Sequence, residues 1–197
     1  MPAALTLADV IAPDDFTSQD DFAAEQQFRY LTERRQVRVG PAVTIVFENR
    51  QTLWFRLQEL SRVARLTSAR SVQQELDWYN QLLPNRDGLQ AAFWIALPGQ
   101  RSTRELQILR HAISLGRVGF RDAQGREILG QFRTDRVADR IIGLARWAEF
   151  PFTDEDRKVF SEPGSGWRVF VEALGYIHEG DVLPDAVWRS LLADLDG

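Results

Sequence analysis

Acidic, basic and amide side chains gather in two neighbouring segments that otherwise have the composition of a buried core. The segments cover residues 47–60 and 74–84. Carboxylate and amide oxygens in such places suit a hard cation, whereas carboxylates beside guanidinium groups form ion pairs. The candidate site residues are Glu48, Asn49, Arg50, Gln58, Glu59, Glu75, Tyr79 and Asn80.

The elements that must position these residues are a strand and two helices. Residues 43–47 are β-branched and nearly all apolar, which predicts a strand. From residue 49 to about 66, leucines and an alanine recur at helical spacing and predict a helix with one buried stripe. A second helix is expected over residues 69–83, before a turn at 84–88.

Glu75 lies within the apolar sector of the second helix, beside Val72, Leu76 and Tyr79. An unpaired buried carboxylate costs several kcal/mol, so we expect Glu75 to meet an arginine, a donor cluster or a metal. One hypothesis places five residues in a single polar cluster: Glu48, Arg50, Glu59, Glu75 and Asn80. The alternative is a purely structural ion-pair network, chiefly Arg50 with Glu75 or Glu59.

Hairpins and helices follow along the rest of the chain without regular β–α alternation. Strands are expected at 89–97, 115–121, 127–132, 141–150 and 167–177, and helices at 22–35, 102–111, 153–160 and 184–195. This order predicts a single-domain α+β fold with an antiparallel or mixed sheet and helices packed mainly on one face. Residues 1–162 would form the main domain, and residues 163–197 a strand–helix extension packed on it.

Composition narrows the possible functions. A net charge of −4 argues against nucleic-acid binding, and the absence of cysteine excludes thiolate nucleophiles and thiolate metal sites. Only two histidines are present, His111 and His178. No apolar run is long enough to span a bilayer, and the first residues lack the basic start of a signal peptide. We expect a cytoplasmic protein with no cofactor.

The polar segments carry a resemblance to a known family. The runs 47–50, 58–59 and 75–84 resemble the bacterial family of domain-of-unknown-function 3501, with a weaker similarity in the closing residues 191–195. The family has no established activity. The resemblance implies an accessory protein, and its members' association with rubrerythrin-like and iron–sulfur proteins suggests a link to redox or iron metabolism.

The chain departs from the family pattern where that pattern has possible metal ligands. The resemblance leads us to expect histidines where this chain has Gln74 and Arg146, and a further histidine within residues 172–176, which contain none. A glutamate is expected at the position of Ala96. The resemblance thus implies a divergent member without a metal site, in which Arg146 supplies the charge near Glu48, Glu59 or Glu75.

Three functional readings remain open. The first is a non-catalytic accessory or binding protein with a carboxylate–arginine cluster in place of a metal. The second is a metal-dependent enzyme or metal-binding protein that uses the carboxylates of Glu48, Glu59 and Glu75. The third is a subunit whose exposed tryptophans bury against a second copy or another protein. The sequence does not decide whether the protein is an enzyme.

Overall fold

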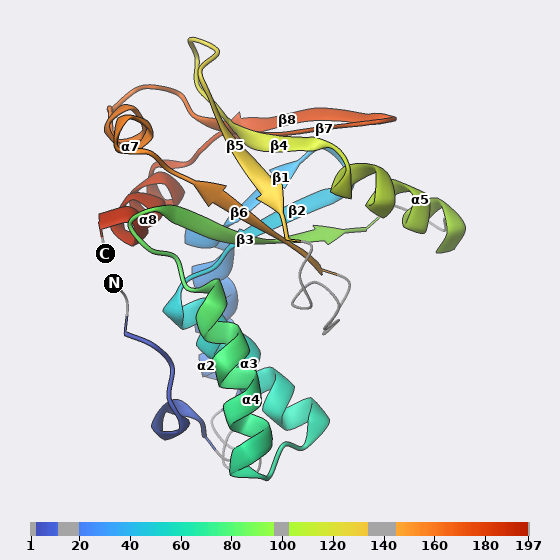
Figure 1. Ribbon diagram of the computed structural model, residues 1–197, viewed down its shortest axis with the longest axis vertical. Coiled ribbons are helices and arrows are strands. Elements are labelled where there is room, and N and C mark those ends of the chain that lie inside the picture. Colours follow the sequence, from blue (N-terminus) through green and yellow to red (C-terminus); the bar gives the residue numbers. More distant parts are fainter. Residues whose placement is uncertain (1–2, 12–19, 97–102, 134–144, 197) are drawn as a thin grey trace.

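The computed structural model describes residues 3–11, 20–96, 103–133 and 145–196. A strongly curved sheet forms one half of the molecule, and three helices extend from it on one side (Figure 1). The first residues of the strand expected over 141–150 lie outside the described residues. The same holds for the first residue of the helix expected over 102–111.

Eight antiparallel strands form the sheet in the order β1-β2-β3-β6-β5-β4-β7-β8. Their bounds are β1 Gln36–Val39, β2 Val43–Phe47, β3 Gly88–Ile95, β4 Arg117–Arg121, β5 Glu127–Phe132, β6 Ala145–Pro151, β7 Arg168–Ala173 and β8 Tyr176–Val182. β5 joins the two halves, because it pairs with β4 through its first residues and with β6 through its last.

The sheet is nearly closed into a barrel, since its two edge strands meet. The hydroxyl of Tyr176 on β8 donates to the carbonyl of Val39 at 2.5 Å and accepts from the backbone N–H groups of Ala42 and Val43. A Cβ added at Gly180 would lie 2.8 Å from the carbonyl oxygen of Arg38. Glycine therefore allows β8 to approach β1 closely.

The predicted sheet with helices packed mainly on one face is wrong. The sheet curves until it is nearly closed, and the side chains of its own strands fill the interior. The inner face therefore needs little cover from helices. Phe47, Phe120 and Phe150 contact one another there, with ring centroids 5.1–5.7 Å apart. Sequence alternation identifies the inward residues, but it does not reveal the curvature that closes the sheet.

The helices have bounds close to those expected. They are α2 Asp20–Tyr30, α3 Arg50–Ala64, α4 Ala69–Tyr79, α5 Thr103–Ser114, α7 Asp154–Phe160 and α8 Asp185–Asp196. Short 3-10 helices form η1 Leu7–Asp9 and η4 Asn80–Leu82, and a π-helical segment, η3 Leu31–Arg35, continues α2. α7 and α8 insert Phe160, Val187 and Leu191 into the barrel core. α3 and α4 form a separate core with the outer side chains Ala92 and Trp147.

The expected single strand over 167–177 is in fact a hairpin. β7 and β8 are joined by a turn at Leu174 and Gly175, where Gly175 adopts a φ of 75° that favours glycine. Both strands belong to the same sheet as β4. The division of the chain at residue 163 remains a prediction.

Arg35 fastens the closing helix to the barrel from a fully buried position. Its Nε donates to the carbonyl of Phe47 at 2.9 Å, and its Nη2 donates to the carbonyl of Glu48 at 3.0 Å and to Asp194 on α8 at 2.5 Å. Burial raises the pKa of the Asp194 carboxyl, and the charge of Arg35 opposes that shift. The C-terminal helix is thus tied to the end of β2.

The hydroxyl of Tyr176 should contribute measurably to stability. In Tyr176→Phe, two backbone N–H groups and one carbonyl lose a partner at a buried site, so we expect the free energy of unfolding to fall by about 2–4 kcal/mol. Tyr30→Phe is the control, because it removes one half-buried hydrogen bond from Asn49 and should cost about 1 kcal/mol. If urea denaturation showed equal losses of unfolding free energy in the two variants, the proposed role of Tyr176 in closing the sheet would be contradicted.

Candidate functional site

Glu48 is the buried carboxylate around which the site is built. It follows β2 and has the same outward orientation as Val46, because Phe47 between them points into the barrel. Its backbone N–H donates to the carbonyl of Gln90 at 2.8 Å, and its carbonyl accepts from Arg35. The whole residue is 0% exposed. The side chain therefore depends on protein partners.

Arg56 and Thr52 supply those partners from α3. Nε of Arg56 lies 2.8 Å from Oε1 of Glu48 and Nη2 lies 2.7 Å from it, while the hydroxyl of Thr52 donates to Oε2. Thr52 and Arg56 are one turn apart on the same helix face. Asn49 caps this helix and accepts from the N–H of Thr52. Both oxygens of the buried carboxylate are thus satisfied.

The guanidinium of Arg56 also contacts two indole rings. Its Cζ lies 5.3 Å from the ring centroid of Trp94 on β3 and 5.5 Å from that of Trp147 on β6. Trp147 pairs with Ala92 in the ladder, so the two tryptophans are diagonal neighbours on the outer face of the sheet. Arg56 is therefore held by a carboxylate and by cation–π contacts.

A cavity of about 390 Å³ lies over this arrangement, between α3, α4 and the outer face of the barrel. Its walls are largely apolar and aromatic. The lining residues are Leu31, Val46, Thr52, Phe55, Arg56, Glu59, Leu60, Val63, Glu75, Trp78, Tyr79, Trp94 and Trp147. Size and composition match those of sites for small molecules. We call it the α3–α4 pocket.

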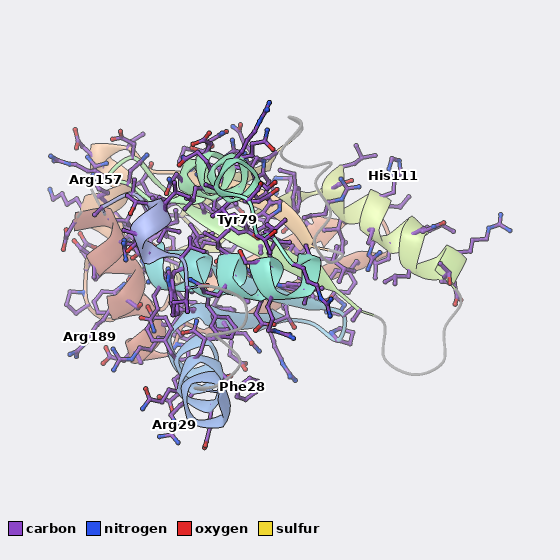
Figure 2. The ribbon with its side chains drawn as sticks, turned by 90° about the horizontal axis from the view of Figure 1, so that it is seen from below. Phe28, Arg29, Tyr79, His111, Arg157 and Arg189 are labelled. Carbon is purple, nitrogen blue, oxygen red and sulfur yellow. The ribbon has the colours of Figure 1, made fainter. Side chains whose placement is uncertain are left out.

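Tyr79 lies between α3 and α4 (Figure 2). Burial raises the pKa of its phenol to about 12, although the positive charge of Arg56 acts in the opposite direction. Glu75 and Glu48 add smaller increases. The phenol therefore stays protonated and remains a hydrogen-bond donor across the ordinary pH range.

Three predicted site residues form a different cluster that holds the N-terminal segment. Arg50 pairs with Asp9 at 2.6 Å, rather than with Glu75 or Glu59 as expected. Gln58 bonds the backbone of Asp9 and Ile11, and Asn80 bonds both backbone groups of Leu5. The backbone N–H of Thr6 and the guanidinium of Arg50 hold the pKa of Asp9 below its usual value. These contacts attach the N-terminal segment to α3 and η4.

The remaining predicted residues are divided between the pocket and other surfaces. Glu59 and Glu75 line the α3–α4 pocket, and Glu59 also pairs with Arg62 at 2.9 Å. Gln74 is exposed on α4 and does not line the pocket. The five residues therefore fall into two groups: Glu48, Glu59 and Glu75 at the pocket, and Arg50 and Asn80 in the cluster that holds the N-terminal segment. We call this second cluster the N-terminal clamp.

Arg146 does not join the pocket group. Alternate residues of a strand point to the same face, so Arg146 faces the same way as Ala148 and Phe150, which point into the barrel. Trp147, between them, faces the pocket. Burial, and to a smaller extent the charge of Arg146, lower the pKa of Arg110 on α5. The expectation that Arg146 stands near Glu48 fails because strand alternation turns the side chain to the other face of the sheet.

Arg56, the true partner of Glu48, was not among the predicted site residues. A signal existed, because Arg56 lies eight positions after Glu48 and four after Thr52 on a strongly predicted helix. The role of Trp94 and Trp147 depends on the pairing of β3 with β6, which local sequence patterns do not specify. Among the residues described, no group of three or more histidine, cysteine or acidic side chains could hold a metal ion.

Loss of the Glu48 charge should destabilise the fold. Glu48→Gln leaves Arg56 without its counter-ion in a largely buried place, so we expect the free energy of unfolding to fall by about 3–5 kcal/mol. Glu59→Gln is the control, because its pair with Arg62 is exposed to solvent and should be worth less than about 1 kcal/mol. Similar losses in the two variants would contradict the buried role of Glu48.

The raised pKa of Tyr79 predicts a pH effect. The folded state favours the neutral phenol, so this contribution is complete below the unfolded pKa of about 10 and is lost as pH rises through about 12. Between those values, the wild type should lose about 2–3 kcal/mol more stability than Tyr79→Phe. Urea denaturation at several pH values measures the difference, and parallel curves would contradict it.

Comparisons with known proteins agree with the resemblance seen in the sequence. The family model described as "Protein of unknown function (DUF3501)" matches residues 4–195. A crystal structure of a novel protein of unknown function from Burkholderia pseudomallei K96243 is similar, with a TM-score of 0.80 at 18% identity, covering 98% of this chain and 100% of that one. None of the curated proteins matches the chain. At this identity the likeness supports the fold alone.

Proposed function

Because the chain belongs to the DUF3501 family, to which no activity is assigned, we propose its function from the α3–α4 pocket: a non-catalytic protein that binds a small organic molecule. The observation that carries the proposal is the aromatic cavity of about 390 Å³ with a satisfied ion pair beneath it. The proposed accessory role and the link to redox or iron metabolism remain predictions from the family resemblance.

The pairing of Glu48 supports binding rather than catalysis. A general base needs an oxygen that can reach a substrate proton, whereas both carboxylate oxygens of Glu48 already accept hydrogen bonds from Arg56 and Thr52. Arg56 in turn lies over two indole rings. These groups give the pocket a rigid polar floor, which favours recognition of one ligand orientation.

The geometry gives little support to an ion shared by Glu48, Glu59 and Glu75. Glu48 is occupied by its partners, and Glu59 is engaged with Arg62. A metal would have to displace a buried guanidinium from its carboxylate, which costs several kcal/mol. We therefore infer that an arginine, Arg56 rather than Arg146, occupies the place of a cation.

A substitution at the pocket rim tests the binding function. Val63 lines the pocket and is 72% exposed, so Val63→Trp should narrow the entrance without disturbing the core. A library of small aromatic fragments, screened by saturation-transfer NMR, should give hits with the wild type that weaken at least about tenfold in Val63→Trp. Val63→Ala is the matched control and should keep them.

Two outcomes would contradict the proposed function. Either no fragment binds the wild type, or the hits bind Val63→Trp as well as they bind the control. Circular dichroism of both variants would establish that they are folded before binding is compared.

A second candidate function, self-association, is favoured by an apolar surface beside α5. Ile108 of α5 and Leu115, which directly follows that helix, meet Leu174 and Ile177 of the β7–β8 hairpin around one open cavity, and all four are largely exposed. Leu174 is 92% exposed. Such patches on soluble proteins mark interaction sites. All six tryptophans are buried or half-buried, which gives no support to the reading that exposed tryptophans form such a surface.

The test of self-association is the mass in solution. Sedimentation should show a dimer for the wild type and a monomer for Leu174→Glu, because a buried unpaired charge opposes association. Val182→Glu is the control, since Val182 is exposed on β8 but lies outside this cavity. A monomeric wild type would overturn the candidate.

The part of the chain that the structure describes holds no helix long and apolar enough to cross a membrane.

A further inference from the structure

We propose that the ligand of the α3–α4 pocket is an uncharged carbonyl compound, in which a ketone, ester or amide group is attached to an apolar or aromatic body. The inference rests on the proposed binding function and deepens it by naming the ligand class. Three features of the pocket lead to it: hydrogen-bond donors without a partner, an ion pair that is already neutral, and apolar walls around the remaining volume.

The first unused donor is the hydroxyl of Tyr79. The residue lines the pocket and is 3% exposed, and among the described residues its hydroxyl forms no hydrogen bond. The oxygen is nevertheless not fully shielded, unlike the indole nitrogen of Trp78, which is buried without a partner. The raised pKa of the phenol, about 12, keeps its proton in place. A hydroxyl kept from most water without a partner is unfavourable, and an acceptor on a ligand would remove that penalty.

The second unused donor is Nη1 of Arg56. Nε and Nη2 of this residue contact Glu48 at 2.8 and 2.7 Å, whereas no hydrogen bond involves Nη1 in the part of the chain that the structure describes. Arg56 lines the pocket, and its side chain is 20% exposed. A guanidinium only donates, whereas a phenol donates or accepts, so the ligand group that satisfies both residues is an acceptor. A carbonyl oxygen, with two lone pairs, suits this requirement.

The charge of the pocket floor favours a neutral acceptor over an anion. Arg56 and Glu48 neutralise one another, and Glu48 is fully buried, so a carboxylate ligand would have to share the guanidinium with it. Such sharing would leave a buried charge partly unpaired, which is strongly unfavourable. A carbonyl oxygen accepts from the N–H groups of Nη1 and leaves the pair between Arg56 and Glu48 intact.

The apolar walls determine the rest of the ligand. A cavity of about 390 Å³ lies within the range typical of whole small-molecule ligands. Leu31, Val46, Phe55 and Leu60 line it, so a small polar molecule would leave most of the apolar wall unfilled. The carbonyl group should therefore be attached to an apolar or aromatic body that packs against these side chains.

Three probes of nearly equal size separate recognition of a neutral acceptor from simple apolar binding. They are benzylacetone, which carries a ketone, butylbenzene, which has no polar group, and hydrocinnamate, which is anionic at neutral pH. Each is titrated into the full chain and followed by calorimetry and ligand-observed NMR. We expect benzylacetone to bind about tenfold more tightly than hydrocinnamate, because the anion loses its hydration and finds the guanidinium already paired.

Removal of a single oxygen atom then assigns the effect to Tyr79. Tyr79→Phe should weaken benzylacetone binding about fivefold and leave butylbenzene within about twofold, because only the ketone accepts a hydrogen bond. Tyr30→Phe is the matched control, since Tyr30 does not line the pocket. It should change the affinity for either probe by less than about twofold. Retained binding of butylbenzene shows that Tyr79→Phe is folded and that its pocket is intact.

The outcomes distinguish this inference from the binding function beneath it. An unchanged benzylacetone affinity in Tyr79→Phe, an equal loss for butylbenzene, or hydrocinnamate binding as tightly as benzylacetone would overturn the carbonyl inference alone. The proposed binding function would then stand. If none of the three probes binds the wild type at concentrations up to its solubility limit, both the inference and the binding function are overturned.

Discussion

The ion pair between Glu48 and Arg56 is the interaction on which the pocket depends. It joins the end of β2 to the middle of α3, and the carbonyl of the same glutamate accepts from Arg35, which is tied to α8. The helical half and the closing helix thus meet at one residue. Buried carboxylates need partners of this kind, because an unpaired charge in the core would cost several kcal/mol.

This constraint explains why the pocket has a rigid floor. Thr52, Arg56 and the two indoles of Trp94 and Trp147 fix each other's positions, so α3 cannot slide along the sheet without breaking a buried contact. The walls of the pocket are then shaped by apolar side chains of α3 and α4. In the N-terminal clamp, Asp9 forms an ion pair with Arg50, which lies on the same helix.

Much of this structure could be predicted from the sequence, and the failures have physical causes. Periodicity identified α3, α4, β2 and β5 with nearly correct bounds, and family membership is confirmed by the match over residues 4–195. The closure of the barrel was missed, because it depends on Tyr176 meeting residues more than a hundred positions earlier. Glu75 was predicted as the buried acid and is only half-buried, whereas Glu48, predicted as a member of the polar cluster, is fully buried. Its partner Arg56 was not predicted, since charge alone does not choose among many arginines.

A double-mutant cycle on Glu48 and Arg56 tests the central claim most directly. The free energies of unfolding of Glu48→Gln, Arg56→Met, the double variant and the wild type give the coupling between the two side chains. The account predicts a coupling of at least about 2 kcal/mol, with the double variant more stable than Glu48→Gln alone. A coupling below about 0.5 kcal/mol would mean that the two charges act independently, and would contradict it.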